Sequence, residues 1–195
     1  MVNTFLPIRM NKVDQIRNIL QVMFPYQTAL DYASQCDKGG TFGTNIHQQI
    51  STILPLREEM ERLGLLECWK STVLIVSSSE VGLHGDGDSR YSYTLVFPVW
   101  NTQNTLTQFY ESSLPPVDVA MELEGSSFTY HGYDINKCRL IDSVEIIQPT
   151  IINVDTPHRV IHQDNSSGVR VTAAIRLHDK YVVEKALEKI YHEQL

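Results

Sequence analysis

Three short stretches of the sequence carry side chains that could bind a metal ion or an anion. In the first, "LHGDGDSR", His84 and Asp86 lie one residue apart, where a strand is expected to run into a loop. Because side chains alternate along a strand, the imidazole and the carboxylate would share a face and could bind one cation. A single His-Gly-Asp triplet is also common in solvated turns, so its meaning depends on the other two stretches.

The second and third stretches predict a β-hairpin with polar side chains on one face. In "TPHRVIHQ", His158 and His162 are four residues apart, and alternation places both on one face and Arg159 on the other. The segment "QDNSSG" is rich in turn residues. In "GVRVTAAIRL", which follows it, Arg170 and Thr172 share a face of the returning strand. The hairpin therefore brings imidazoles, a guanidinium and a hydroxyl close together.

Together these residues predict a metal centre beside an anion-binding arginine. Two imidazoles and one carboxylate from separate strands form the facial triad that binds Fe(II) and leaves positions open for substrates and oxygen. The planar guanidinium of Arg170 is suited to hold a carboxylate through paired hydrogen bonds.

In this order, His84-x-Asp86, then His158, then Arg170-x-Thr172, the chain resembles the Fe(II)- and 2-oxoglutarate-dependent oxygenases. The phrase "TIINVDTPHRVIHQ" is close to that family's own stretch, and the resemblance covers roughly residues 72 to 177. It implies that His84, Asp86 and His158 hold a catalytic iron, and that Arg170 and Thr172 bind the distal carboxylate of 2-oxoglutarate. It also implies that O2 and 2-oxoglutarate are consumed, succinate and CO2 are released, and a prime substrate is hydroxylated.

Two positions leave a choice of metal ligand. His162 rivals His158, since both share a face, and the "HRV" phrase favours His158. Asp88 rivals Asp86, and the one-residue spacing from His84 favours Asp86.

The expected cosubstrate pocket departs from the family pattern at one position and leaves a choice of residues at others. Thr172 replaces the family's usual serine and keeps the hydroxyl. Tyr91, Tyr93 and Tyr110 are candidates to complete the pocket, with Tyr93 preferred, although aromatic residues on strands more often belong to a core. Arg90 and Arg159 either meet an acidic substrate or face solvent.

The elements that position these residues are predicted to be strands flanked by helices. Apolar spacing predicts a helix from Asn11 to near Pro25 and a second from Thr44 or Asn45 to Gly64. From Thr72 onward, short segments rich in β-branched and aromatic residues predict seven or eight strands. A last helix follows Asp179, its predicted cap.

The expected fold class is therefore mainly β with flanking helices (α+β). The resemblance makes the core a double-stranded β-helix, or jelly roll, of the cupin-like kind. The 195 residues fit one domain, with a helical N-terminal support over 1–70, the core over 72–177 and a C-terminal helix over 179–195.

The composition excludes several function classes. The formal net charge of −7 opposes nucleic-acid binding, and no apolar run is long enough to cross a membrane. The three cysteines form no CxxC pair, and the N-terminus has no secretion signal, so a cytoplasmic location is expected. His47, His131, His178 and His192 have no evident partners and are expected to be surface or structural residues.

The prime substrate is expected to be a small molecule or a peptide side chain. Residues 38–45 and 111–127 have the loop composition of a substrate-specificity region, and the longer one has the length of a lid. The alternative function is a non-catalytic, cupin-like module that binds a metal or a small acid. The sequence makes no prediction about the oligomeric state.

Overall fold

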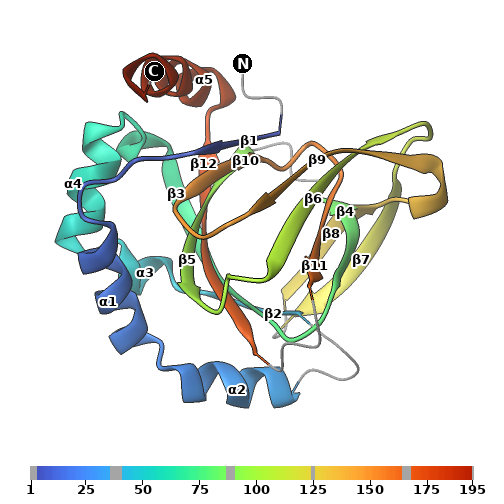
Figure 1. Ribbon diagram of the computed structural model, residues 1–195, viewed down its shortest axis with the longest axis horizontal. Coiled ribbons are helices and arrows are strands. Elements are labelled where there is room, and N and C mark those ends of the chain that lie inside the picture. Colours follow the sequence, from blue (N-terminus) through green and yellow to red (C-terminus); the bar gives the residue numbers. More distant parts are fainter. Residues whose placement is uncertain (1–3, 36–40, 87–90, 124–125, 164–167, 195) are drawn as a thin grey trace.

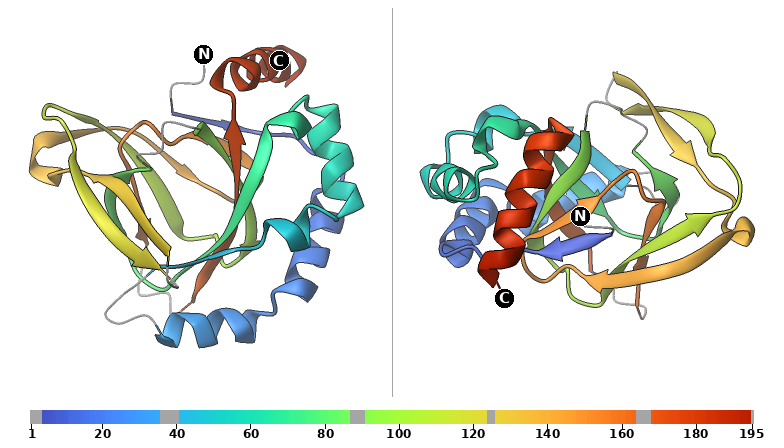
Figure 2. Two further views of the ribbon diagram at one scale, coloured as in Figure 1. Left: turned by 180° about the vertical axis from the view of Figure 1, so that it is seen from behind. Right: turned by 90° about the horizontal axis from the view of Figure 1, so that it is seen from above.

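Two six-stranded antiparallel sheets face each other and enclose a common interior (Figures 1 and 2). A computed structural model of the chain describes residues 4–35, 41–86, 91–123, 126–163 and 168–194. The first sheet has the strand order β1-β10-β5-β12-β3-β2 and the second β7-β8-β4-β11-β6-β9. The strands alternate between the sheets over much of the chain, and that alternation is what builds a jelly roll.

The strands of the first sheet are β1 (Phe5–Pro7), β2 (Thr41–Asn45), β3 (Trp69–Ser77), β5 (Tyr91–Trp100), β10 (Thr150–Asn153) and β12 (Arg170–His178). Those of the second are β4 (Val81–Gly85), β6 (Thr105–Ser112), β7 (Val117–Leu123), β8 (Ser126–Gly132), β9 (Cys138–Glu145) and β11 (His158–His162). The helices are α1 (Val13–Met23), α2 (Tyr26–Gln35), α3 (His47–Ile50), α4 (Leu54–Arg62) and α5 (Lys180–Gln194), with 3-10 turns at Leu66–Cys68 and Ile135–Lys137.

The helices cover the outer face of the first sheet, where the main hydrophobic core lies (Figure 1). Ile16 and Leu20 of α1 are fully buried against it. Alternate residues of β5 and β12 enter the same core, so the intervening residues of these strands face the other sheet. None of the helices in the described ranges is both long and apolar enough to cross a membrane.

Two of the three predicted helices are found much as expected. The helix predicted between Asn11 and Pro25 is α1. The C-terminal helix is α5, and the Asp179 carboxylate accepts a hydrogen bond from the Val182 amide at 3.2 Å, as a helix cap does.

The helix predicted from Thr44 or Asn45 to Gly64 is found as two helices, α3 and α4. Its expected start is wrong, because Thr44 and Asn45 end the edge strand β2. The second helix, α4, begins at Leu54, where Pro55 in the first turn is well suited to a helix start. The segment before residue 70, predicted to be helical, thus also contributes two strands, β1 and β2. Gly64 does end α4, with a positive φ of 72°.

The strand predictions hold best in the buried centre of the first sheet. The segment "YSYTLVFPVW" is β5 over its whole length. The hydrophobic segment from Ser143 to Asp155 contains the end of β9 and all of β10, because the chain crosses from one sheet to the other near Pro149. The predicted lid over 111–127 includes β7, which pairs with β8.

Candidate metal centre and anion pocket

Two neighbouring strands of the second sheet bring the metal-ligand candidates together. His84 lies near the end of β4, and His158 begins β11 and is its direct partner in the register of the sheet. Asp86 follows β4, where its backbone amide donates to the Val154 carbonyl at 3.3 Å. The side chains of His84 and Asp86 thus fall on one face, as the alternation along the strand predicts.

The three side chains form a compact group of potential ligands. One ligand atom from each of His84, Asp86 and His158 lies within 4.8 Å of the other two. His84 Nε2 is 3.8 Å from Asp86 Oδ1, and the two imidazole ring centres are 4.5 Å apart. Atoms this close need only small side-chain shifts to bind one ion at about 2.1 Å each.

Backbone carbonyls fix the orientation of both imidazoles. His84 Nδ1 donates to the Gly82 carbonyl at 2.7 Å, and His158 Nδ1 donates to the Thr156 carbonyl at 2.9 Å. Because a carbonyl can only accept, each ring carries its proton on Nδ1 and presents the lone pair of Nε2. This is the usual arrangement of metal-binding histidines.

His158 is held in its neutral form by its surroundings. Burial, together with the proximity of the His84 imidazole, lowers the pKa of His158 to about 4, although Asp86 opposes the shift. The ring centre of Phe109 lies 6.2 Å away and that of Tyr130 lies 6.0 Å from His84. A metal binds only neutral imidazole, so this environment favours a ligand over a cation.

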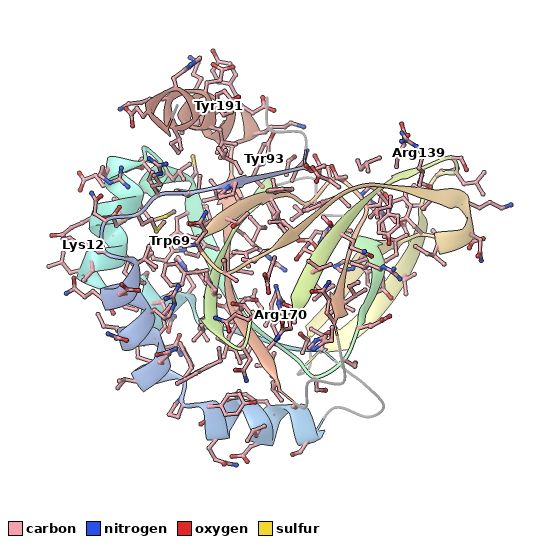
Figure 3. All side chains as sticks on the ribbon, viewed as in Figure 1. Lys12, Trp69, Tyr93, Arg139, Arg170 and Tyr191 are labelled. Carbon is pink, nitrogen blue, oxygen red and sulfur yellow. The ribbon has the colours of Figure 1, made fainter. Side chains whose placement is uncertain are left out.

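The predicted hairpin is wrong, because β11 and β12 belong to different sheets. On the sheet opposite the metal-ligand candidates, Arg170 and Thr172 form a second polar group that faces the same interior. Figure 3 shows Arg170 between the two sheets, and its side chain is only 4% exposed. Burial lowers the pKa of Arg170 to about 10, so the guanidinium stays charged at neutral pH. Within the described ranges, no carboxylate pairs with it, and neither its Nε nor the Thr172 hydroxyl has a hydrogen-bond partner. A buried cation without a counter-charge is costly, and the described part of the chain supplies none.

The structure groups His158, and not His162, with His84 and Asp86. His162 lies at the far end of β11, on the same face as His158. The rival ligand Asp88 and the candidate Arg90 lie outside the described residues.

Tyr93 does not lie where the sequence analysis expected it. It belongs to the helix-facing core, and its hydroxyl donates to Glu184 of α5 at 3.0 Å (Figure 3). This placement is on the opposite face of the sheet from Arg170 and Thr172, so Tyr93 does not fit the predicted cosubstrate pocket. Burial and the bond to Glu184 raise its pKa well above the ordinary value.

The other polar candidates do not all face the interior between the sheets. Tyr91 belongs to the smaller core cluster, with Phe109 and Val154. Tyr110 and Arg159 lie together, since the guanidinium is 5.5 Å from the ring centre and its Nε donates to Gln108. Arg159 thus points away from the metal ligands, as its position in the strand predicts.

The remaining histidines have partners that the sequence did not reveal. His131 pairs with Asp118 at 2.8 Å, His47 contacts the edge of Trp69, and His178 stacks on Tyr91. His192 contacts the neighbouring Tyr191.

One site residue was missed by the sequence analysis. Ser77 ends β3 directly opposite Arg170, is fully buried, and has a hydroxyl without a partner. Its only signal was its place at the polar end of a hydrophobic strand, where three serines follow one another.

Comparisons with known proteins place this geometry in a known architecture. No family model matches the chain, and neither does any curated protein. Among solved structures, the epimerase SnoN, in complex with Fe3+, alpha ketoglutarate and nogalamycin RO, matches with 11% identity and a TM-score of 0.55. The match covers 90% of this chain and 79% of SnoN. AviO1 from Streptomyces viridochromogenes matches with 15% identity and a TM-score of 0.50, over 91% of this chain and 90% of AviO1.

The chain has the double-stranded β-helix fold. The expected fold class, mainly β with flanking helices, is therefore confirmed. In this double-stranded β-helix, the three ligand candidates come from one sheet and the buried arginine from the other.

Proposed function

We propose that the chain is an Fe(II)- and 2-oxoglutarate-dependent dioxygenase that hydroxylates a small molecule or a peptide side chain. One observation carries the proposal: His84, Asp86 and His158 face the same interior as Arg170, a buried cation without an acidic partner among the described residues. A metal centre and an anion pocket that share one interior fit a cosubstrate that both chelates a metal and carries a distant carboxylate.

The donor set fits Fe(II). Two imidazole nitrogens and one carboxylate oxygen are the ligands of the facial triad, which leaves three positions for other molecules. Both imidazoles already present Nε2 because their Nδ1 atoms donate to backbone carbonyls. The ligands therefore need little reorganisation to bind an ion.

The opposite wall fits the far carboxylate of 2-oxoglutarate. Arg170 offers a planar pair of donors, and the Thr172 hydroxyl lies on the same face of β12. Pairing with a carboxylate would satisfy the buried cation and fix the orientation of the cosubstrate.

Bound iron and 2-oxoglutarate would supply the oxidative chemistry, in which O2 is consumed, 2-oxoglutarate becomes succinate and CO2, and the prime substrate gains a hydroxyl. The chain's own residues bind and orient these groups. The Gly82 and Thr156 carbonyls hold the imidazole rings, and the rings of Tyr130 and Phe109 lie beside His84 and His158.

The test is an anaerobic titration of the protein with Fe(II) and then with 2-oxoglutarate. The chelate is expected to produce a weak visible charge-transfer band, and oxygen is then expected to yield succinate. His84→Ala and His158→Ala should lose the band, and Arg170→Ala should require more 2-oxoglutarate to produce it. A matched control is His131→Ala, because His131 is the register partner of Gly85 but pairs with Asp118.

If His84→Ala kept the band, the assignment of His84 as a metal ligand would be wrong. Absence of both band and succinate in the wild type would overturn the dioxygenase proposal and favour the non-catalytic binding module. His162→Ala should keep the band, since His162 is not grouped with the metal-ligand candidates.

A further inference from the structure

The interior between the sheets holds a group of buried polar atoms that lack hydrogen-bond partners. Among the described residues, seven buried side-chain nitrogen or oxygen atoms have no partner, and five of them belong to four residues. These residues are Ser77, His162, Arg170 and Thr172. Buried polar groups without partners destabilise a fold, so a concentration of them in one region indicates a binding site.

The four residues come from three strands and both sheets. Ser77 of β3 is the register partner of Arg170 on β12, and Thr172 follows on the same face. His162 comes from the opposite sheet, where it shares the inner face of β11 with His158. Ser77, Arg170 and Thr172 thus form one wall of the interior, and His162 extends from the other wall.

The charge of Arg170 affects the His162 imidazole, as their shared interior predicts. Burial, and then the positive charge of Arg170, lowers the pKa of the His162 imidazole, while Glu80 opposes the shift. His162 is therefore neutral at neutral pH and carries one N–H donor and one acceptor nitrogen. Neither ring nitrogen has a partner.

We infer that His162 donates a hydrogen bond to the same carboxylate that Arg170 and Thr172 hold. The inference rests on the proposed function and assigns His162 to the cosubstrate pocket instead of the metal centre. A carboxylate has enough lone pairs to accept from the guanidinium, the threonine hydroxyl and the imidazole together. The pocket thereby selects 2-oxo acids that end in a second carboxylate.

The test compares two cosubstrate analogues of equal length. 2-Oxoglutarate ends in a carboxylate, and 2-oxopentanoate has a methyl group in its place. Dissociation constants of both acids are measured by calorimetry on the Fe(II)-loaded protein under argon. The wild type should bind 2-oxoglutarate more tightly, because only that acid reaches the donors at the far end of the pocket.

His162→Phe keeps an aromatic ring but removes the N–H group. It should raise the dissociation constant of 2-oxoglutarate about tenfold, the effect of losing one hydrogen bond to a charged group. The constant for 2-oxopentanoate should stay the same. His162→Gln, which keeps a donor, should recover part of the loss.

A matched control is Thr105→Val on β6. Thr105 is the register partner of His162 and is buried, but its hydroxyl already donates to the Thr102 carbonyl at 2.8 Å. This variant should leave the preference for 2-oxoglutarate over 2-oxopentanoate unchanged. If His162→Phe fails to fold, His162→Ala provides the same comparison.

Three results have distinct meanings. If the wild type does not distinguish the two acids, the proposed function fails at Arg170, and this inference fails with it. If the wild type distinguishes them and Arg170→Ala removes the preference, the proposed pocket stands. In that case an unchanged His162→Phe, or one that binds both acids equally less well, overturns the role of His162 alone.

Discussion

The two faces of strand β12 differ in whether their buried side chains have suitable partners. The helix-facing side carries Val171, Ala173, Ile175 and Leu177, all fully buried among apolar neighbours. The inner side begins with Arg170 and Thr172, which are nearly as buried but have polar atoms without partners.

On this one strand, the residues that stabilise the fold thus lie on one face, and the residues proposed to bind a ligand lie on the other. Apolar burial on the outer face stabilises the fold by about 25 cal/mol per Å² of surface removed from water. The unpaired polar atoms on the inner face cost stability unless a ligand satisfies them. Under the proposed function, the inner face therefore gains a bound anion at the expense of the free protein's stability.

The largest effect is expected from Asp86, a metal-ligand candidate that faces the interior between the sheets and contributes little to packing. Asp86 is partly exposed at the end of β4, so Asp86→Ala should change the free energy of unfolding by less than about 0.5 kcal/mol. Its Fe(II) affinity should fall more than about 100-fold, beyond the loss typical of residues that only support a ligand. Metal titration and urea unfolding without metal measure the two quantities. A large loss of stability with intact Fe(II) binding would contradict the view that the residues facing the interior serve binding and not stability.

The opposite pattern is expected on the outer face. Ile175 is fully buried against the helices, so Ile175→Ala should reduce the free energy of unfolding by about 2–5 kcal/mol. The affinity of the folded protein for 2-oxoglutarate should not change. Urea unfolding and calorimetry on the same preparation check both, and a selective loss of affinity would show that the two faces are coupled.

Arg170→Met should increase the stability of the ligand-free protein and weaken its binding of 2-oxoglutarate. It removes a buried cation that has no acidic partner in the described part of the chain and keeps a side chain of similar length, so the ligand-free protein should gain about 1 kcal/mol of stability or more. The affinity for 2-oxoglutarate should fall about 100-fold with the lost charged hydrogen bonds. A variant less stable than the wild type would indicate that Arg170 has a structural role.

The smallest effect is expected from Tyr93→Phe. It removes only the hydroxyl bond to Glu184 on the helix-facing side, which should cost about 1 kcal/mol. Binding of 2-oxoglutarate should be unaffected, and calorimetry would expose any contribution of Tyr93 to the pocket.

The sequence predicted those features that depend on local pattern. The spacing of His84 and Asp86, and of Arg170 and Thr172, sets a shared face through strand alternation alone, and the structure brings each pair to the interior. The apolar periods of α1 and α5 and the Asp179 cap of α5 are equally local.

Features that depend on pairing between distant strands could not be predicted. β5 is buried on both faces, so no hydrophobic alternation revealed that Tyr93 points to the helices. Ser77 became a candidate only through its register with Arg170, and β2 joins the sheet as an edge strand through pairing with β3. Single-sequence patterns carry no information about register across such distances.

The most direct test of the central claim is calorimetric titration of 2-oxoglutarate into the protein under argon, with and without Fe(II). The account predicts tight binding only with Fe(II), because the metal and Arg170 each hold one end of the molecule. Binding of equal strength without the metal, or no binding in its presence, would contradict it.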